Sequence, residues 1–448
     1  MRAPGRPCLA SGIKTFDAVE VHPGDRAHDE SKGDAGSSAR EVGPECRVDV
    51  PRASCRSGSA WTRRAVLHLM AASATGCCFG VPTAPVEPTE PRTTPLPMPA
   101  VPSAAAFTPV STHVFSIGVL SYAHNDLFPS FPAAGRRDDV LVDAFVARGV
   151  LPSSIVRVRD AEATRAGILT QLDAMLARLP STADLVVYFA GHGFRDTDGR
   201  TYFAAFDTGE EASSGVSHEE LLSSVGARAN RVLFLIDCCY SGALGELVLA
   251  TQPNARFAVL ASSLASEIST GAWTFTDAVI EALHGAAVCD TDHDGRITLA
   301  DVANYAESEL AFADGQLATY VRTAGFPSEF LLGPAGVLPF ARFGENVEVA
   351  WRNRWWPAKI VDRVGEGFLV HYVGFEQDAD EVVSLDRIRP FAPLTHEVGT
   401  SVQVRWHGEW FPAVVTQARL GLHRVHYDGF SDAWDEWVSR PRIRLRHP

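Results

Sequence analysis

The sequence predicts a multidomain protein: a disordered N-terminal region, an α/β domain with a mostly parallel sheet and helices on both faces, and two small all-β barrels. Three observations predict this architecture. Strand-like apolar runs alternate with amphipathic helical runs from about His113 onward. The C-terminal part contains an internal repeat, in which Gly344 aligns with Gly399. Residues 1–61, in contrast, have no apolar periodicity.

The overall composition is that of an ordinary globular protein, with 46% hydrophobic and 21% charged residues among 448. The formal net charge of −14 argues against a nucleic-acid partner, because phosphate contacts need a basic field. Eight cysteines include the adjacent pairs Cys77-Cys78 and Cys238-Cys239. Adjacent cysteines rarely bridge each other, so the spacing does not predict a disulfide framework.

The N-terminal region divides into three segments. We expect residues 1–61, rich in Gly, Pro, Arg, Asp and Ser, to be disordered or to result from an over-long translation start. In residues 62–81 two arginines precede a short apolar run, which resembles a twin-arginine export signal, and ATGC resembles a lipobox with Cys77 as the acceptor. Residues 82–111 form a proline-rich linker. The segments together predict an exported bacterial protein, attached to a membrane through a lipidated Cys77; the alternative is a cytoplasmic protein.

The α/β domain is expected over residues 112–335. Its first strand is HVFSIGVLSY and its first helix is DDVLVDAFVARG. The strand SSIVRV, the helix EATRAGILTQLDAMLARLP and the strand ADLVVYFAGHG follow, with RTYFAAFDT as an added or edge strand. The helix SHEELLSSVGAR opens with Ser217 and has Glu220 three residues later, the pattern of a capping box. The strands RVLFLID and RFAVLASS and the helix WTFTDAVIEALHG complete an alternation that implies right-handed crossovers and a parallel sheet.

Two chemically reactive residues follow two of these strands directly. His192 comes just after LVVYFA, and Cys239 comes just after VLFLID. In parallel α/β folds the reactive groups lie at the carboxyl ends of the strands. If the two strands are neighbours, His192 and Cys239 meet at one edge of the sheet.

The sequences around these residues, YFAGHG and DCCYSG, resemble the His and Cys motifs of caspase-like cysteine peptidases. The resemblance is nearest to the metacaspases and their bacterial relatives, and it runs from about Thr112 to Leu310. It implies a caspase-like fold and a His192/Cys239 dyad that cleaves peptide bonds. It also implies that the backbone N–H groups of Gly193 and Cys239 form the oxyanion hole.

The residue types fit this chemistry. A thiol attacks as the thiolate, and a nearby imidazole can take up the thiol proton and later protonate the leaving amine. Strand alternation directs Cys239 to the site and its neighbour Cys238 into packing. The glycines on both sides of His192 are expected to let the backbone approach a substrate closely.

The resemblance also implies a specificity pocket. Asp237 stands where the metacaspase pattern has an acid that lines the pocket for a basic P1 side chain, and Asp207 matches a second acid of that pocket. Carboxylates there favour Arg or Lys. The short connection after the cysteine strand favours an active single chain over a two-subunit form.

A calcium-like loop follows in DTDHDGRITLAD, residues 290–301. Its spacing is that of an EF-hand loop, which holds one ion in oxygen ligands. Asp301 replaces the usual Glu at the last position, which predicts weaker Ca²⁺ binding or a shift toward Mg²⁺. The predicted ligands are Asp290, Asp292, Asp294, Arg296 and Asp301. No cofactor is required for the peptidase chemistry itself.

The two repeats, expected over residues 342–392 and 397–446, each contain short alternating strands joined by Gly-bearing turns. VHYDGFSDAWDEWV strongly resembles the chromo-barrel and Tudor-knot modules of the Tudor-like SH3 barrels. The resemblance implies an aromatic cage for a methylated ammonium in the second copy, formed by Phe411, Tyr427, Phe430 and Trp434. The first copy has Ala379 in the fourth place, so its cage is incomplete. We expect the other tryptophans, Trp351, Trp406 and Trp437, to belong to the barrel cores.

Two functions are compatible with these features. The first is a caspase-like cysteine endopeptidase that cleaves after Arg or Lys, with barrels that recruit a target by binding a peptide or a methylated-lysine-like ligand. The second is an inactive caspase-like adaptor that binds partners through its barrels. Labelling of Cys239 distinguishes them.

Overall fold

The computed structural model describes residues 106–448 apart from 133–134, 227, 253 and 447–448. The predicted disordered region 1–61, the predicted export signal 62–81 with Cys77, and most of the linker 82–111 therefore lie outside the described residues. Among the described helices, none has the length and apolar character needed to cross a membrane.

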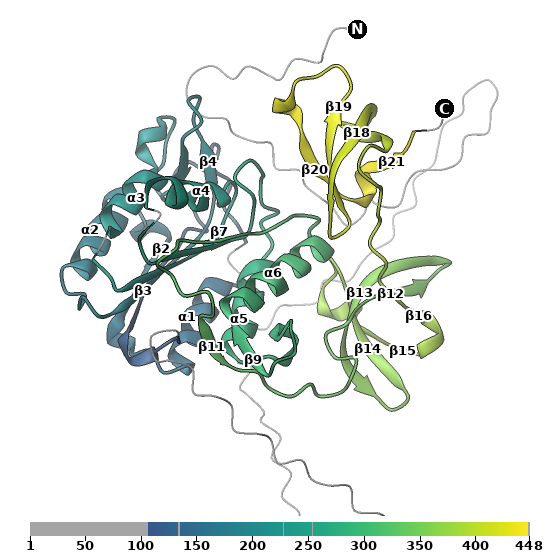
Figure 1. Ribbon diagram of the computed structural model, residues 1–448, viewed down its shortest axis with the longest axis horizontal. Helices are drawn as coiled ribbons and strands as arrows, with labels where there is room; N and C mark the ends of the chain where they lie inside the picture. Colours follow the sequence, from purple (N-terminus) through teal and green to yellow (C-terminus); the bar gives the residue numbers. More distant parts are fainter. Residues whose placement is uncertain (1–105, 133–134, 227, 253, 447–448) are drawn as a thin grey trace, which may run out of the picture. The chain divides into compact units, whose positions relative to one another are not determined.

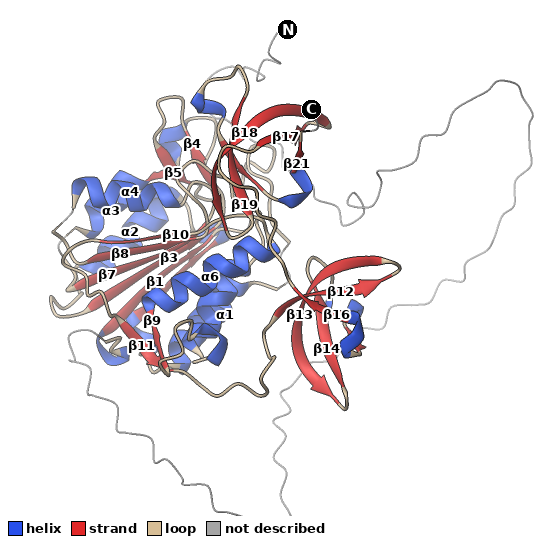
Figure 2. Cartoon of the chain, turned by 45° about the vertical axis from the view of Figure 1, so that its right-hand side comes forward, coloured by secondary structure: helices blue, strands red, loops and turns tan. Residues whose placement is uncertain are grey.

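The α/β domain is built on a six-stranded sheet with the strand order β10-β8-β7-β3-β1-β2 (Figure 2). All neighbouring strands are parallel except the edge pair of β10 and β8. The strands are β1 (Thr112–Gly118), β2 (Ile155–Arg159), β3 (Asp184–Ala190), β7 (Arg231–Asp237), β8 (Phe257–Ala261) and β10 (Thr319–Arg322). The central strands β3 and β7 are buried along their whole length, which explains their unbroken apolar sequence.

Three helices pack on each face of this sheet (Figures 1 and 2). On one face lie α2 (Arg165–Leu176), α3 (His218–Val225) and α4 (Gly242–Thr251). On the other face lie α1 (Arg137–Ala147), α5 (Thr274–Leu283) and α6 (Leu299–Ala313). The predicted fold class, a mostly parallel sheet covered on both faces, is confirmed for this part of the chain.

Two small additions flank the main sheet. One is a three-stranded antiparallel sheet of β4 (Gly193–Arg195), β5 (Thr201–Phe203) and β6 (Val216–Ser217). The other is a two-stranded pair of β9 (Arg296–Thr298) and β11 (Leu331–Pro334). The predicted added strand RTYFAAFDT thus lies in a separate sheet, and the chain leaves the main sheet after Ala190.

The helix α3 begins at the predicted cap, but only half of the predicted capping box forms. The Ser217 hydroxyl accepts a hydrogen bond from the Glu220 backbone N–H at 3.0 Å. The Glu220 carboxylate pairs instead with Arg165 at the start of α2, at 2.6 Å. The Glu220 side chain therefore connects α3 to α2 and does not complete the capping box of α3.

Each C-terminal repeat is a five-stranded antiparallel sheet, with the orders β15-β14-β13-β12-β16 and β20-β19-β18-β17-β21. The first barrel consists of β12 (Asn346–Trp351), β13 (Arg354–Val364), β14 (Gly367–Tyr372), β15 (Glu381–Val383) and β16 (Ile388–Pro390). The second consists of β17 (Ser401–Trp406), β18 (Glu409–Arg419), β19 (Leu422–Tyr427), β20 (Glu436–Val438) and β21 (Ile443–Leu445). Both long central strands shift register at the same repeat position, between Ile360 and Asp362 and between Val415 and Gln417. The predicted pair of all-β barrels is therefore confirmed.

Candidate active site

The register of the main sheet places His192 and Cys239 at the same edge. Strands β3 and β7 are parallel neighbours, and Ala190 is paired with Asp237 at their carboxyl ends. His192 and Cys239 each lie two residues beyond this pair. The two reactive residues, distant in the sequence, thus follow the tips of adjacent strands, as the sequence predicted from strand order.

Glycines next to His192 bring the strand tips into backbone contact. A Cβ on Gly193 would lie 2.1 Å from the carbonyl oxygen of Cys239 and 3.0 Å from the sulfur of Cys238. A Cβ on Gly191, whose φ is +154°, would lie 2.7 Å from the Tyr122 hydroxyl. The sequence interpretation gave these glycines a role in substrate approach. In the structure the space that they leave is filled by the protein's own atoms.

The imidazole of His192 is held by a loop that follows β1. Its Nε2 lies 2.8 Å from the carbonyl oxygen of Pro129. Because a carbonyl only accepts, Nε2 carries the proton in this contact, and Nδ1 is left as the unprotonated nitrogen. The His192 backbone N–H donates to the Tyr122 hydroxyl at 2.8 Å, and that hydroxyl donates to Val119 O. The Pro129 contact orients the imidazole ring, and the Tyr122 contact holds the backbone of His192.

Aromatic rings from the same loop surround the imidazole. Phe131 stacks on it with ring centroids 4.5 Å apart, and the rings of Tyr122 and Phe128 lie at 5.1 and 5.8 Å. Burial lowers the pKa of His192, and the Pro129 carbonyl opposes that shift. The ring is therefore a neutral base near neutral pH. Sequence reasoning missed Tyr122, Pro129 and Phe131, because no motif marks the loop that carries them.

The sulfur of Cys239 lies at the turn between β7 and α4. It accepts a hydrogen bond from the Ser269 N–H at 3.3 Å and lies 3.8 Å from the Ser269 carbonyl oxygen. Burial raises the pKa of the Cys239 thiol, and the Ser269 N–H opposes that rise. Cys238 is only 2% exposed and belongs to the core on the α2–α4 face. The predicted division between a packing cysteine and a site cysteine agrees with this burial.

The turn after Cys239 has an uncommon backbone conformation. Tyr240 has a φ of +57°, a left-handed value that few residues other than glycine adopt. Its N–H donates to the Glu267 carbonyl at 2.8 Å. This turn is the local reason why the chain can pass directly from a buried strand to α4.

The backbone N–H of Gly193 is directed away from its partner strand. The Ala204 N–H donates to the His192 carbonyl at 2.9 Å, so His192 and Ala204 form a hydrogen-bonded pair of the β4–β5 ladder. The next pair, Gly193 and Phe203, is then a pair without ladder hydrogen bonds. The Gly193 N–H consequently does not point toward Phe203.

The two acids predicted for the specificity pocket lie in different surroundings. Asp237 is 8% exposed, and its Oδ2 accepts a hydrogen bond from the Thr276 hydroxyl at the start of α5 at 2.6 Å. Burial raises the pKa of Asp237 to about 6, against hydrogen bonds from Thr276 and Ser262. Asp207 is exposed and accepts from the Arg165 N–H at the start of α2, at 2.8 Å. Because α5 and α2 cover opposite faces of the sheet, these contacts do not bring the two acids together.

Three of the five predicted metal ligands gather in the calcium-like loop. The side-chain oxygens of Asp290, Asp292 and Asp294 lie within 4.8 Å of one another. Asp301 lies outside this group. Its carboxylate accepts from Thr298 N and Oγ1, closing a capping box at the start of α6, and from Thr291.

The fifth predicted ligand of the loop, Arg296, pairs with one of these acids. Its guanidinium lies 2.8 Å from the Asp294 carboxylate. The described geometry thus offers a three-carboxylate group with one neighbouring cation. Such a group could hold a hard divalent ion through oxygen atoms.

The second barrel carries a box of aromatic rings. The ring centroid of Trp406 lies 6.0 Å from that of Phe411 and 6.1 Å from that of Trp434, and the interplanar angles are 70° and 86°. Phe430 closes the row, 5.9 Å from Trp434 and 6.2 Å from Tyr427. These near-perpendicular rings include all four predicted cage residues. Trp406, which the sequence analysis assigned to the core, is the fifth wall.

The first barrel has the corresponding rings but lacks one wall. The ring centroid of Trp356 lies 5.9 Å from those of Trp351 and Phe375, and the centroid of Phe375 lies 6.3 Å from that of Tyr372. Ala379 occupies the position of Trp434. Trp351 is 44% exposed, so its assignment to the core was wrong: it lines the open box. Trp437 of the second barrel is half-buried.

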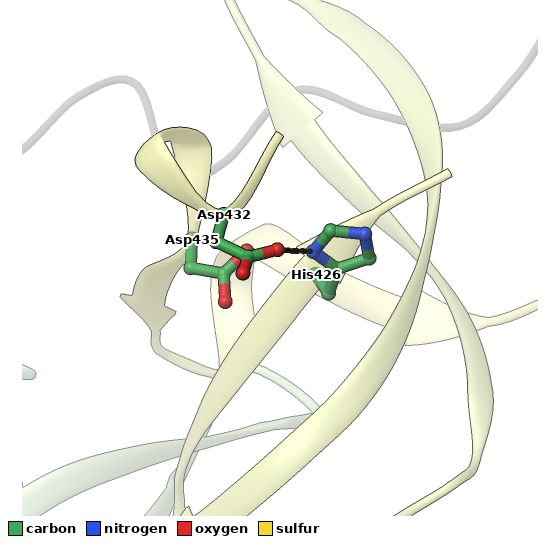
Figure 3. Close-up of side chains that lie close together, drawn as sticks. All are labelled: His426, Asp432 and Asp435. Atoms are coloured by element: carbon green, nitrogen blue, oxygen red, sulfur yellow. Dashed lines mark hydrogen bonds and ion pairs between the residues drawn. The ribbon is translucent and has the colours of Figure 1, made fainter. Parts of the chain in front are cut away.

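A histidine and two acids hold the turn that carries Trp434 (Figure 3). His426 Nδ1 on β19 lies 2.8 Å from Asp435 and 3.5 Å from Asp432. Asp432 and Trp434 belong to one short 3-10 turn. The three side chains could hold a metal ion, and the hydrogen bond between His426 and Asp435 connects β19 to this turn. In the first barrel the pair of His371 and Asp380 is 2.6 Å apart.

Comparisons with known proteins agree with this division of the chain. Residues 344–393 match the family described as "Agenet domain", and residues 396–445 match the Tudor-knot family, described as "RNA binding activity-knot of a chromodomain". No curated protein matches the chain.

Solved structures similar to this chain are of two kinds. A Geobacter sulfurreducens protein is 14% identical with a TM-score of 0.38, and the match covers 51% of this chain and 99% of that one. Caspase-1 from Spodoptera frugiperda is 14% identical with a TM-score of 0.37, over 55% and 98% of the two chains. The Arabidopsis thaliana AGDP1 AGD34 structure is 25% identical with a TM-score of 0.13, over 23% and 81%. The family matches thus cover the two barrels, residues 344–393 and 396–445.

Proposed function

We propose that the α/β domain is a cysteine endopeptidase in which Cys239 is the nucleophile and His192 is the general base. The observation that carries this proposal is the shared register of the two strand tips. It is supported by the Pro129 contact, which leaves Nδ1 of His192 free to accept a proton. A neutral imidazole beside a thiol is a competent starting state for this chemistry.

The reaction follows from these groups. The thiol proton passes to Nδ1 of His192 as the sulfur bonds to the scissile carbonyl carbon. The N–H groups of Gly193 and Cys239 would bind the resulting oxyanion. The imidazolium then protonates the leaving amine, and water attacks the thioester with His192 again as the base. The face of Phe131, stacked on the ring, favours the transient imidazolium through cation–π attraction.

For the substrate we propose a protein or peptide with Arg or Lys at P1, recognised by Asp237. A buried carboxylate at the end of β7 complements a positive side chain once it is ionised. Asp207 has a lesser part in this proposal, because it caps α2 on the other face.

This recognition predicts a pH dependence. Since the pKa of Asp237 is about 6, kcat/KM on an Arg substrate should rise with pH through about 6 as the carboxylate ionises. In Asp237→Asn the rise at pH 6 should disappear, and kcat/KM should fall by roughly tenfold to a hundredfold, as expected for one hydrogen bond to a charged group. A profile that is unchanged in Asp237→Asn would remove Asp237 from recognition.

Labelling with an Arg chloromethylketone tests the catalytic proposal. Wild-type protein and Cys238→Ala should be labelled at Cys239 and should cleave Arg substrates. Cys239→Ala should show neither labelling nor cleavage. If wild type and Cys239→Ala behave identically on Arg, Lys and Asp P1 substrates, the inactive adaptor is the correct function.

We further propose that the second barrel recruits a target by binding a methylated ammonium group. The box of five rings that includes Trp406 and Trp434 supports this, because aromatic faces attract such cations. Titration of the full chain with a peptide carrying trimethyllysine tests it. Binding of the unmethylated peptide with equal affinity would contradict it.

Two expectations from the sequence remain proposals. Asp290, Asp292 and Asp294, with the Arg296 carbonyl, would hold Ca²⁺ or Mg²⁺ as a structural clip. A rise in the unfolding temperature with millimolar Ca²⁺ that is lost in Asp292→Asn tests this site. Export and lipidation at Cys77 are tested by fractionation of wild type and Cys77→Ala.

A further inference from the structure

The loop that follows β8 lies against the sulfur of Cys239. We call residues 262–270 the Ser269 loop. The backbone of one residue of this loop contacts the sulfur, with the Ser269 N–H at 3.3 Å and the Ser269 carbonyl oxygen at 3.8 Å. The N–H is the contact that matters for reactivity, because a donor aimed at a sulfur favours the thiolate over the thiol.

A single side chain binds both ends of this loop. Gln316 lies just before β10 and is 8% exposed. Its Nε2 donates to the Ser262 carbonyl at 2.8 Å and reaches the Ser269 hydroxyl at 3.4 Å. Its Oε1 accepts from the Thr270 N–H at 3.0 Å. The amide thus uses both of its donors and its acceptor on the loop.

The middle of the loop is fixed by other groups. The Tyr240 N–H donates to the Glu267 carbonyl at 2.8 Å, and the Arg195 guanidinium donates to the Ala265 carbonyl. These anchors do not involve Gln316. The end of the loop that carries Ser269 contacts Gln316, Cys239 and, at 3.5 Å, the Ser262 hydroxyl. Loss of the Gln316 amide should therefore release this end while the middle stays in place.

We propose that Gln316 is a positioning residue for Cys239: its side-chain amide holds the Ser269 loop so that the Ser269 N–H stays directed at the sulfur. The proposal rests on the assignment of Cys239 as the nucleophile. It adds a residue from outside both sequence motifs to the machinery, one that touches neither the sulfur nor the imidazole.

The other ionisable groups around the sulfur do not change when Gln316 is substituted. Asp237 and Cys238 directly precede Cys239 in the chain, His192 follows the tip of β3, and Tyr122 comes from the loop after β1. A change in the acidity of Cys239 in a Gln316 variant consequently reports the Ser269 contact rather than a new charge.

The test is the pH dependence of alkylation of Cys239 by iodoacetamide in the full chain, followed at the level of the modified peptide by mass spectrometry. The alkylation rate follows the thiolate fraction, so its midpoint gives the acidity of the thiol. Gln316→Met keeps the volume of the side chain and removes all three hydrogen bonds. We expect its midpoint to rise by about one pH unit, the size of one hydrogen bond to a charged group. The exposed Gln252→Ala is the matched control and should leave the midpoint unchanged.

Two outcomes would overturn the proposal. One is a midpoint that is the same in wild type and Gln316→Met, and the other is a faster rate at every pH with no change in midpoint, which would make the loop a simple cover. If Gln316→Met does not fold, as judged by thermal unfolding, Gln316→Ala is measured in the same way. A shifted midpoint in a protein that cleaves no Arg, Lys or Asp substrate would contradict the peptidase function and leave the positioning role intact.

Discussion

The two C-terminal barrels have the same fold and differ at the site where a ligand would bind. Both have the same strand order, the same register shift in their long strand and the same His–Asp contact. The second barrel surrounds its box with five rings, while the first has Ala379 where the second has Trp434. The two barrels thus keep one fold although one ring of the box differs, even though Tyr427 belongs to the core of the second barrel and Trp434 packs against it.

The comparison shows how a single substitution can give two barrels of the same fold different ligand-binding boxes. Most walls of the box come from positions that both repeats share, so the fold presents them in either case. The last wall stands on a short 3-10 turn outside the five strands, and Ala379 shows that the first barrel forms without a ring at this position. This position can therefore gain or lose a ring without loss of the fold.

The largest effect is expected from removal of the last wall in the second barrel. Trp434→Ala should weaken the binding of a trimethyllysine peptide to the full chain by about 30-fold, since one desolvated cation–π contact contributes about 2 kcal/mol. Calorimetric titration measures the change. Trp410→Ala is the control, because Trp410 stacks on Arg444 instead of facing the other cage rings. Equal losses in both variants would show that the box is not the binding site.

The reverse substitution in the first barrel should give a smaller effect. Ala379→Trp, made together with Trp434→Ala, should restore measurable binding, because Trp351, Trp356 and Phe375 occupy the repeat positions of Trp406, Phe411 and Phe430. The same titration reports the gain. A double variant that binds no better than Trp434→Ala alone would mean that the two boxes differ in more than this wall.

The smallest effect is expected from the contact that holds the turn. His426→Asn removes the hydrogen bond between the imidazole and Asp435 and should weaken binding two- to fivefold, since one such hydrogen bond contributes about 1 kcal/mol or less. His371→Asn removes the matching pair in the first barrel and should not change the affinity. If both variants weaken binding to the same extent, the ligand does not distinguish the barrels.

The sequence was sufficient to predict the features that depend on periodicity and order. The alternation of strands and helices predicted the parallel sheet, and strand order placed His192 and Cys239 at one edge. The repeat predicted both barrels. Burial of Cys238 also agreed with strand alternation. These features are regular, so they appear in the sequence as spacing.

Features set by contacts between distant loops could not be predicted. Pro129 acts through its carbonyl, which every residue has, so no sequence pattern distinguishes it. Gln316 reaches the Ser269 loop from a different connection. Asp301 fits an ion-binding spacing and a capping box equally well, and only the structure shows that it caps α6. Trp351 and Trp406 could not be separated from core residues, because small barrels use aromatic residues for both purposes.

The contact between Gly193 and the Cys239 carbonyl has a consequence for how this protein can change over generations. The separation of the backbones at His192 and Cys239 is set by main chain against main chain, so substitutions of surrounding side chains can accumulate without altering that separation. Any side chain at Gly193, even a methyl group, would force the two strand tips apart. The side chains around this edge of the sheet are therefore open to gradual selection, whereas position 193 is closed to it.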